Sequence, residues 1–267
     1  GAELGRRSGG GAELGRRSGG GAELGRRPGD GAEPAFFLDR YLYRTNPVFE
    51  GLAFGLGRRL ARLAAEATRS SQIRLYFDQV FVKDPGTTEQ FSWHQDRPFW
   101  AIDGTQVAST WVALTESDAA GSALEFVTGS HRWGVDMRPD YPGLRGADPT
   151  EAEERLWPGV AQHLGNFDVT AIDYEDEPDD YHVESFAGSP GDVLLFDYRV
   201  VHRSRGNSSD RPRKAVSWRW LGDDATWAPK VGSDPIVSQG DTVVRPGERI
   251  SDDEAFPVLY SAESQGA

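Results

Sequence analysis

A series of short β-prone segments, each ended by a turn sequence, constrains the fold most strongly. Segments rich in β-branched and aromatic residues lie at 72–83, 106–115, 124–127, 183–186, 193–198 and 213–221. Turn sequences follow some of them directly or precede the next, as in DPGT at 84–87 and SPGD at 189–192. Many short strands with this punctuation are typical of a β-sandwich or a jelly roll. We therefore predict a mainly β domain of this class.

An amphipathic helix precedes these strands. From Phe49 to Arg69, leucines and alanines recur at helical spacing, and arginines occupy other positions. The aromatic-rich segment 36–50 comes before the helix and contains a turn at Asn46-Pro47. We expect the apolar side of the helix to pack on a sheet.

The first 30 residues repeat a glycine-rich decapeptide. GAELGRRSGG occurs twice and GAELGRRPGD follows it. Such a unit cannot bury a core, so we predict that residues 1–35 form a disordered tail or reflect an artefact of the gene model. An arginine-bearing docking arm is the alternative, although a glutamate in each copy dilutes its charge. Residues 36–267 are long enough for one domain with a buried core.

A long acidic segment interrupts the predicted strands. Residues 136–182 are rich in Asp, Glu, Pro and Gly and include the run EDEPDD at 175–180. We predict a long insertion with a short helix near Thr150–Leu156. Long loops on a rigid scaffold often select substrates, and a solvated acidic loop is the alternative. The C-terminal tail, 222–267, has few strand signals.

The composition excludes several classes of protein. The chain contains no cysteine, which excludes disulfides, thiolate metal sites and cysteine nucleophiles. Its formal net charge of −13 argues against general binding to nucleic acid or anionic membranes. The longest apolar runs are far shorter than a membrane span, and no secretory signal is visible. We expect a cytoplasmic protein that binds a small molecule; the choice between monomer and dimer stays open.

His94 and Asp96 form the most informative motif. On a strand, two residues that are two positions apart point to the same face. A neutral imidazole beside a carboxylate provides two of the three ligands of a facial metal triad, which needs a second histidine. His202 is the best candidate, because it follows an apolar strand where the chain reaches the rim of a barrel.

The other polar residues near this motif are less suitable as ligands. His163 and His182 lie in the polar insertion, and His131 lies in a predicted turn. Gln95 would point to the opposite face of the strand from its neighbours, so we assign it a structural role. Arg97, Phe99 and Trp100 follow the motif and are candidates for the substrate mouth, with the core as the alternative for the two aromatic residues.

Two histidines and one carboxylate suit non-haem Fe(II) and leave positions for a bidentate cosubstrate and for O₂. A 2-oxo acid bound there needs a cation for its distal carboxylate. Arg213 is our candidate, because a guanidinium pairs with both carboxylate oxygens. We expect it on the strand next to His202, facing the same cavity. Ser204 would add a hydroxyl donor, and Trp111 would wall the cosubstrate.

Spaced motifs along the chain resemble the phytanoyl-CoA dioxygenase family. They are WHQD at 93–96, WVAL at 111–114, GSAL at 121–124, GSH at 129–131, GDV at 191–193, and His202 with Arg213. The resemblance covers roughly residues 45–222 and implies a double-stranded β-helix that uses Fe(II), 2-oxoglutarate and O₂. Relatives generally carry more chain before the helix, so the N-terminal part of the family domain is expected to be missing.

The resemblance also assigns roles to individual residues. It places the iron ligands at His94, Asp96 and His202. It places the cosubstrate contacts at Arg213, Ser204, Trp111 and Lys83, the last of which is suggested by the resemblance alone.

The resemblance implies hydroxylation of an aliphatic carbon, with release of succinate and CO₂. Related halogenases lack the ligand carboxylate, so Asp96 favours hydroxylation over halogenation. The acidic composition does not favour a coenzyme A thioester, whose phosphates need basic residues, so we expect a small polar metabolite or natural-product intermediate. One alternative is an inactive fragment or a non-catalytic jelly-roll binding protein. The other is an iron oxygenase or isomerase on the same fold that does not use 2-oxoglutarate, against which Arg213 and Ser204 argue.

Overall fold

A computed structural model describes residues 36–136, 181–229, 237 and 239–263. The predicted tail, 1–35, lies outside the described residues. So does nearly all of the predicted insertion, 136–182, together with its helix near Thr150–Leu156. No helix of the described part is long and apolar enough to cross a membrane.

A six-stranded antiparallel sheet is the larger of two facing sheets. Its strand order is β1-β2-β10-β5-β8, and β12 pairs with β2 on the same edge as β1. Its strands are β1 (Phe36–Arg40), β2 (Gln72–Lys83), β5 (Val107–Ala113), β8 (Val193–Asp197), β10 (Arg213–Leu221) and β12 (Val258–Ser261).

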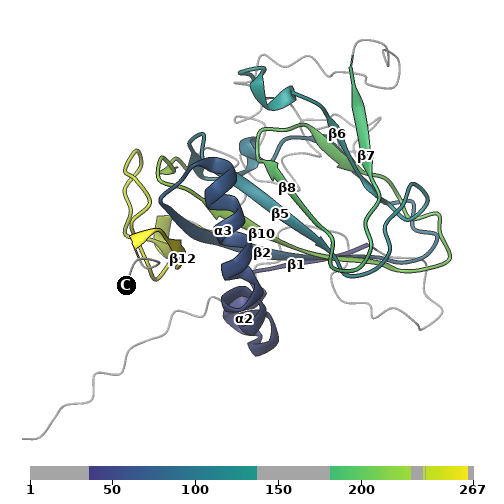
Figure 1. Cartoon of the computed structure of the whole chain (residues 1–267), viewed down its shortest axis with the longest axis horizontal. Helices are drawn as coiled ribbons and strands as arrows, with labels where there is room; N and C mark the ends of the chain where they lie inside the picture. Colours follow the sequence, from purple (N-terminus) through teal and green to yellow (C-terminus); the bar gives the residue numbers. More distant parts are fainter. Residues whose placement is uncertain (1–35, 137–180, 230–236, 238, 264–267) are drawn as a thin grey trace, which may run out of the picture.

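A four-stranded antiparallel sheet, in the order β3-β9-β6-β7, faces the larger one. Its strands are β3 (Phe91–His94), β6 (Leu124–Val127), β7 (Val183–Phe186) and β9 (His202–Ser204). Two short strands, β4 (Ile102–Asp103) and β11 (Thr226–Trp227), form a separate pair. The mainly β, jelly-roll prediction is confirmed, and Figure 1 shows β6 and β7 on the side of the molecule away from α2 and α3.

The described helices lie before β2 and near the turns of the barrel. They are α1 (Leu42–Thr45), α2 (Pro47–Phe54), α3 (Leu56–Thr68) and the 3₁₀ helices Arg97–Phe99, Ser130–Arg132 and Gln239–Asp241. The prediction of one helix from Phe49 to Arg69 was wrong, because the chain breaks at Gly55. A Cβ on Gly55 would lie 2.7 Å from the carbonyl oxygen of Gly51, so this break requires glycine.

Helix α3 covers the outer face of the large sheet. Leu60, Ala61 and Ala64 of the helix are buried in one cluster with Trp218 and Trp220 of β10. Figure 1 shows α3 lying over β2 and β10. The small side chains on the helix let its backbone approach the two tryptophans closely, which confirms the predicted packing of an amphipathic helix on a sheet.

The inner face of the large sheet meets the small sheet. Phe81 of β2, Trp111 of β5 and Ala215 of β10 share a buried cluster with Phe126 of β6. Side chains alternate across a strand, so residues of β10 at odd positions, from Arg213 to Arg219, face this interior. The interior side of β10 therefore carries polar side chains among apolar neighbours.

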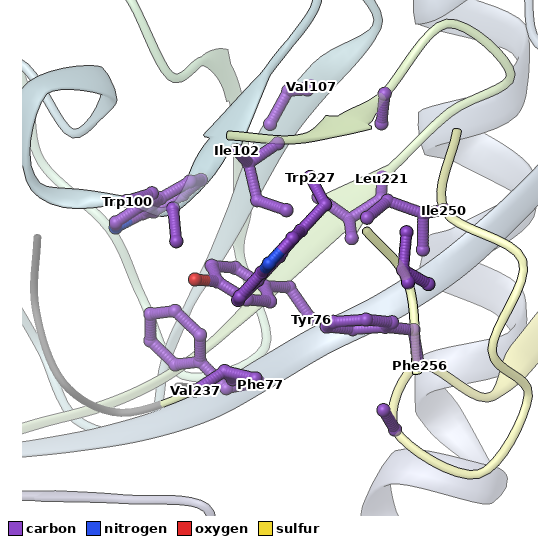
Figure 2. Close-up of a cluster of buried hydrophobic side chains, with 14 of the residues drawn as sticks. Tyr76, Phe77, Trp100, Ile102, Val107, Leu221, Trp227, Val237, Ile250 and Phe256 are labelled. Carbon is purple, nitrogen blue, oxygen red and sulfur yellow. The ribbon is translucent and has the colours of Figure 1, made fainter. Parts of the chain in front are cut away.

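The C-terminal tail closes one end of the barrel, which its composition did not predict. Val244, Ile250 and Phe256 are buried in the same cluster as Tyr76 of β2 and Trp227 of β11. Figure 2 shows Ile250 and Phe256 packed beside Tyr76 and Trp227. Before β12, the apolar residues of the tail occur singly or in pairs among polar residues, Gly and Pro, so they show neither the helical nor the strand period.

Candidate metal centre

His94 ends a strand, and Asp96 lies in the turn that follows it. Strand β3 stops at His94, and Asp96 has helical backbone angles of φ −70° and ψ −34°. The prediction that both residues share one strand was therefore wrong. The backbone N–H groups of Asp96 and Arg97 both donate to the carbonyl of Tyr198, at 3.0 and 3.1 Å, and this fixes the turn. The turn brings the Asp96 carboxyl back beside the His94 ring.

His202 completes the group from the neighbouring strand. It follows strand β8, as predicted, and begins β9 in the small sheet, where it pairs directly with His94 of β3. The two imidazole ring centroids lie 4.3 Å apart. Oδ1 of Asp96 lies 3.8 Å from Nε2 of His94 and 4.0 Å from Nε2 of His202. One ligand atom from each residue lies within 4.8 Å of the others, so the three could hold a metal ion.

The surroundings of His202 prepare it to act as a ligand. Its Nδ1 lies 3.0 Å from the carbonyl oxygen of Val200, which can only accept a hydrogen bond. Nδ1 therefore carries the proton, and the lone pair of Nε2 faces Asp96. Burial, together with the nearby His94, lowers the pKa of His202 to about 3, so the imidazole is neutral at physiological pH.

Asp96 is buried, and its two oxygens have different neighbours. Oδ1 faces the two histidines, whereas Oδ2 accepts a hydrogen bond of 3.1 Å from the Ser109 hydroxyl and lies 3.9 Å from Nε of Arg219. Burial alone would raise the pKa of Asp96. Arg219, the histidines and Ser109 outweigh that effect and hold the pKa below its usual value, so the carboxylate stays ionised.

Arg213 begins β10 of the large sheet. Its neighbours there are β2 and β5, so the prediction that it lies on the strand next to His202 was wrong. Its Nη2 donates to the Ser122 hydroxyl at 3.1 Å, and its guanidinium carbon lies 5.6 Å from the centre of the Trp111 ring. Nε and Nη1 are buried and have no hydrogen-bond partner among the described residues. Burial lowers the pKa of Arg213 to about 10, so it remains a cation.

Unmet donors on a buried cation are costly, and this makes the Arg213 side chain a candidate anion site. Two adjacent N–H groups of one guanidinium match the two oxygens of a carboxylate. Trp111, buried on the interior side of β5, forms the wall against which that carboxylate would lie.

Lys83 lies directly opposite Arg213, at the end of β2. Its Nζ lies within hydrogen-bond distance of the Ser204 hydroxyl at 3.0 Å, the Ser122 hydroxyl at 3.2 Å, and the carbonyls of Ser204 and Arg205 at 3.1 and 2.5 Å. Burial, with a smaller contribution from Arg213, lowers the pKa of Lys83 to about 6. Lys83 and Ser204 therefore lie in the same polar group as Arg213, and Lys83 links β2 to the end of β9.

Several polar residues of this interior were not predicted to belong to the site. Ser122 has a positive φ of 61°, which directs its hydroxyl to both Lys83 and Arg213. In the sequence, Ser122 was noted only as part of the GSAL motif, and no role was predicted for it. Ser109 and Arg219 contact Asp96 from β5 and β10. The signal for Arg219 was its even spacing from Arg213 on one predicted strand.

The residues after the motif divide between the site and the core. The Phe99 ring lies 6.3 Å from the His94 ring and borders the site. Trp100 is a core residue that stacks on Tyr198, with ring centroids 5.6 Å apart. Arg97 forms ion pairs with Asp103 at 3.0 Å and with the largely buried Asp136 at 2.7 Å, and it lines a pocket together with both aspartates.

Gln95 and the other described histidines are not part of the group of candidate metal ligands. The side chain of Gln95 is buried and donates to the carbonyls of Val135 and Arg199, which agrees with a structural role. His131 lies in a 3₁₀ helix, and His182 is exposed and lies 3.0 Å from Glu184. His163 lies outside the described residues.

Comparison with known proteins matches this chain to a protein family. The profile of the phytanoyl-CoA dioxygenase (PhyH) family matches residues 33–215. The chain is 28% identical over 153 residues to "Phytanoyl-CoA dioxygenase domain-containing protein 1" of Danio rerio, covering 55% of this chain and 45% of that protein. It is 28% identical over 130 residues to "Ectoine dioxygenase" of Nocardia farcinica, covering 47% of this chain and 40% of that enzyme. The chain thus spans less than half the length of these two relatives.

Solved structures share the fold. The epimerase SnoN from nogalamycin biosynthesis, in complex with Fe³⁺, alpha ketoglutarate and nogalamycin RO, superposes with a TM-score of 0.59 at 22% identity. The match covers 84% of this chain and 78% of that one. At this identity the likeness establishes a common architecture.

Proposed function

The chain belongs to the phytanoyl-CoA dioxygenase family, and from this premise we propose that it is an Fe(II)- and 2-oxoglutarate-dependent dioxygenase. The proposed reaction hydroxylates an aliphatic carbon of a small metabolite and releases succinate and CO₂. One observation carries the proposal: two imidazoles and an ionised carboxylate converge within 4.8 Å in an interior that also holds a buried guanidinium with unmet donors.

The donor set fits iron. His94 and His202 offer nitrogen and Asp96 offers oxygen, which is the ligand combination of non-haem Fe(II) oxygenases and leaves the remaining positions of the metal open. When bound, iron supplies the chemistry with O₂ that side chains lack. The side chains provide the geometry, because each ligand is held by the backbone of a strand or by a fixed turn.

The polar group around Arg213 fits 2-oxoglutarate. Arg213 would pair with the distal carboxylate through its guanidinium, whose Nε and Nη1 have no partner among the described residues, and Trp111 would pack against the carbon chain. The Ser204 hydroxyl accepts from Lys83, which leaves its own hydrogen free to be donated to the same carboxylate. Arg213 is therefore the main charge partner of the cosubstrate, and Ser204 and Lys83 support it.

Aromatic rings surround the two histidines. Phe91 lies 5.6 Å from His94, and Phe126 and Phe196 lie 5.7 and 4.9 Å from His202, as measured between ring centroids. These rings keep water away from the ligands, which strengthens the electrostatic interactions inside the site and limits side reactions of the oxidant.

A relative and the composition of the chain indicate the class of substrate. The similarity to an ectoine dioxygenase and the acidic composition of this chain both support a small polar metabolite over a coenzyme A thioester. Among the described residues, no carboxylate pairs with Arg213. Its guanidinium is therefore open to the carboxylate of a 2-oxo acid, which argues against an enzyme that uses iron without one.

Anaerobic spectroscopy tests the proposal. Addition of Fe(II) and 2-oxoglutarate to the full chain is expected to produce a weak visible charge-transfer band. His202→Ala should abolish the band, and His182→Ala, which changes an exposed histidine, should keep it. The absence of a band in the wild type, or an unchanged band in His202→Ala, would contradict the proposed function.

A further inference from the structure

Arg219 is a second buried guanidinium on the interior side of β10, behind the metal-facing side of Asp96. Only 6% of its surface is exposed, and its Nε lies 3.9 Å from Oδ2 of Asp96. Asp96 is the one carboxylate that forms an ion pair with it among the described residues. The proposed mechanism gives Arg219 no role toward cosubstrate or substrate.

Neighbouring side chains hold the Arg219 guanidinium in one orientation. Nη2 donates to Oε1 of Gln79 at 2.8 Å, and Nη1 donates to the Ser217 hydroxyl. The guanidinium carbon lies 5.6 Å from the centre of the Phe77 ring and 5.7 Å from that of Trp100. Figure 2 shows both rings in the same buried cluster. A guanidinium that is hydrogen-bonded at both Nη atoms and packed against two rings cannot follow a moving carboxylate, so it fixes the carboxylate instead.

The two oxygens of the Asp96 carboxylate therefore have different roles. Oδ2 contacts Arg219 and the Ser109 hydroxyl, while Oδ1 faces His94 and His202. Rotation of the carboxylate that brought Oδ2 toward the metal would break both contacts of that oxygen. Only Oδ1 is therefore available as a ligand.

We propose that Arg219, oriented by Gln79, is a positioning residue that makes Asp96 bind the metal through Oδ1 alone. This inference rests on the proposed metal site. A carboxylate that binds through one oxygen occupies one position on the metal, whereas a chelating carboxylate would occupy two. The positioning thus preserves the open positions that a bidentate cosubstrate and O₂ require.

Cobalt(II) is a suitable probe, because its visible absorption reports the coordination number and geometry without turnover. The full chain, free of metal, is titrated with Co(II) alone, and the dissociation constant and the spectrum are recorded. Arg219→Met is expected to weaken Co(II) binding about 10–100-fold, the range for loss of a group that orients a metal ligand. The visible spectrum should also change, because the released carboxylate changes its binding mode.

Two further variants separate charge from orientation. Arg219→Lys keeps the charge but cannot contact Asp96, Gln79 and Ser217 together. It is therefore expected to show the same altered Co(II) spectrum as Arg219→Met. Gln79→Leu keeps the guanidinium but removes one of the contacts that orients it, and should weaken Co(II) binding several-fold. These two variants carry the test if Arg219→Met does not fold.

Arg74→Met is the matched control. Arg74 lies on β2 and pairs with Asp253 at 2.5 Å, so its loss removes an arginine ion pair from the same sheet. It should lower the melting temperature and leave Co(II) affinity and spectrum unchanged.

Three results would count against the inference. If folded Arg219→Met has the wild-type Co(II) affinity and spectrum, Arg219 is a structural residue only and the inference is overturned. Wild-type affinity and spectrum in both Arg219→Lys and Gln79→Leu would overturn it as well. If the wild type itself binds no Co(II), the proposed metal site fails, and the inference fails with it.

Discussion

Two buried arginines on one strand show how a protein interior separates binding from positioning. Arg213 and Arg219 both project from the inner side of β10, and both are almost fully buried. Arg219 is paired with Asp96 and hydrogen-bonded to Gln79, whereas two nitrogens of Arg213 have no described partner. Nε of Arg219 also lacks a hydrogen bond, but it lies 3.9 Å from the Asp96 carboxylate. A buried cation beside a carboxylate belongs to the scaffold, and one without a carboxylate among its described neighbours marks a place for an anion.

The Arg219→Met substitution should produce the largest loss of stability. It leaves the Asp96 carboxylate buried without its cation, and breaking a buried pair in this way costs about 3–5 kcal/mol. Chemical denaturation of the metal-free protein measures the effect. A loss below about 1 kcal/mol would show that Asp96 does not depend on Arg219.

The Arg213→Met substitution should have the opposite effect on stability. Removing a cation with unmet donors is expected to raise the unfolding free energy of the free protein by about 1 kcal/mol. The same change should weaken 2-oxoglutarate binding by about 3 kcal/mol, or roughly 100-fold, because a bidentate contact is lost. Denaturation and 2-oxoglutarate titration of one preparation give both values. If the variant were as unstable as Arg219→Met, the contrast between the two arginines would fail.

Lys83 should couple cosubstrate binding to pH. Burial and Arg213 lower its pKa to about 6, and Glu89 is the acidic group that opposes this shift. Lys83 is therefore largely neutral at pH 7 in the free protein. A bound carboxylate raises its pKa, so the complex holds more protons, and affinity for 2-oxoglutarate falls as the pH rises above about 6.

Calorimetry in two buffers of different ionisation enthalpy measures this proton uptake at pH 7. The uptake should be present in the wild type and absent in Lys83→Met. Equal uptake in both proteins would assign the coupling to another group.

Ser204→Ala should have the smallest effect. The substitution removes one neutral donor from the cosubstrate, which is worth about 1 kcal/mol, or about fivefold in the KM for 2-oxoglutarate. Ser208→Ala, which alters an exposed hydroxyl bonded to a backbone carbonyl, provides the control. A change of 100-fold in Ser204→Ala would place Ser204, rather than Arg213, at the centre of cosubstrate binding.

Six of the described strands were predictable because their signal is local. β2, β6, β7 and β10 begin and end where alternation and turn sequences placed them, and β5 and β8 differ by only one or two residues. The candidate ligands were predictable because a histidine and a carboxylate two positions apart form a recognisable pattern, even though the backbone between them proved to be a turn.

What could not be predicted depends on contacts between distant segments. Only the folded chain shows that His202 pairs with His94 across two strands, or that Arg213 lies in the sheet opposite His202. The role of Arg219 was hidden for the same reason, since its partners come from β2 and from the turn after β3. The break at Gly55 and the buried tail also depend on packing that no local pattern encodes.

A crystal structure of the full chain, grown without oxygen in the presence of Fe(II) and 2-oxoglutarate, tests the central claim most directly. Iron, identified by its anomalous scattering, is expected between Nε2 of His94, Nε2 of His202 and Oδ1 of Asp96. The distal carboxylate of 2-oxoglutarate should pair with the guanidinium of Arg213. Iron bound elsewhere, or 2-oxoglutarate bound away from Arg213, would contradict the proposed site.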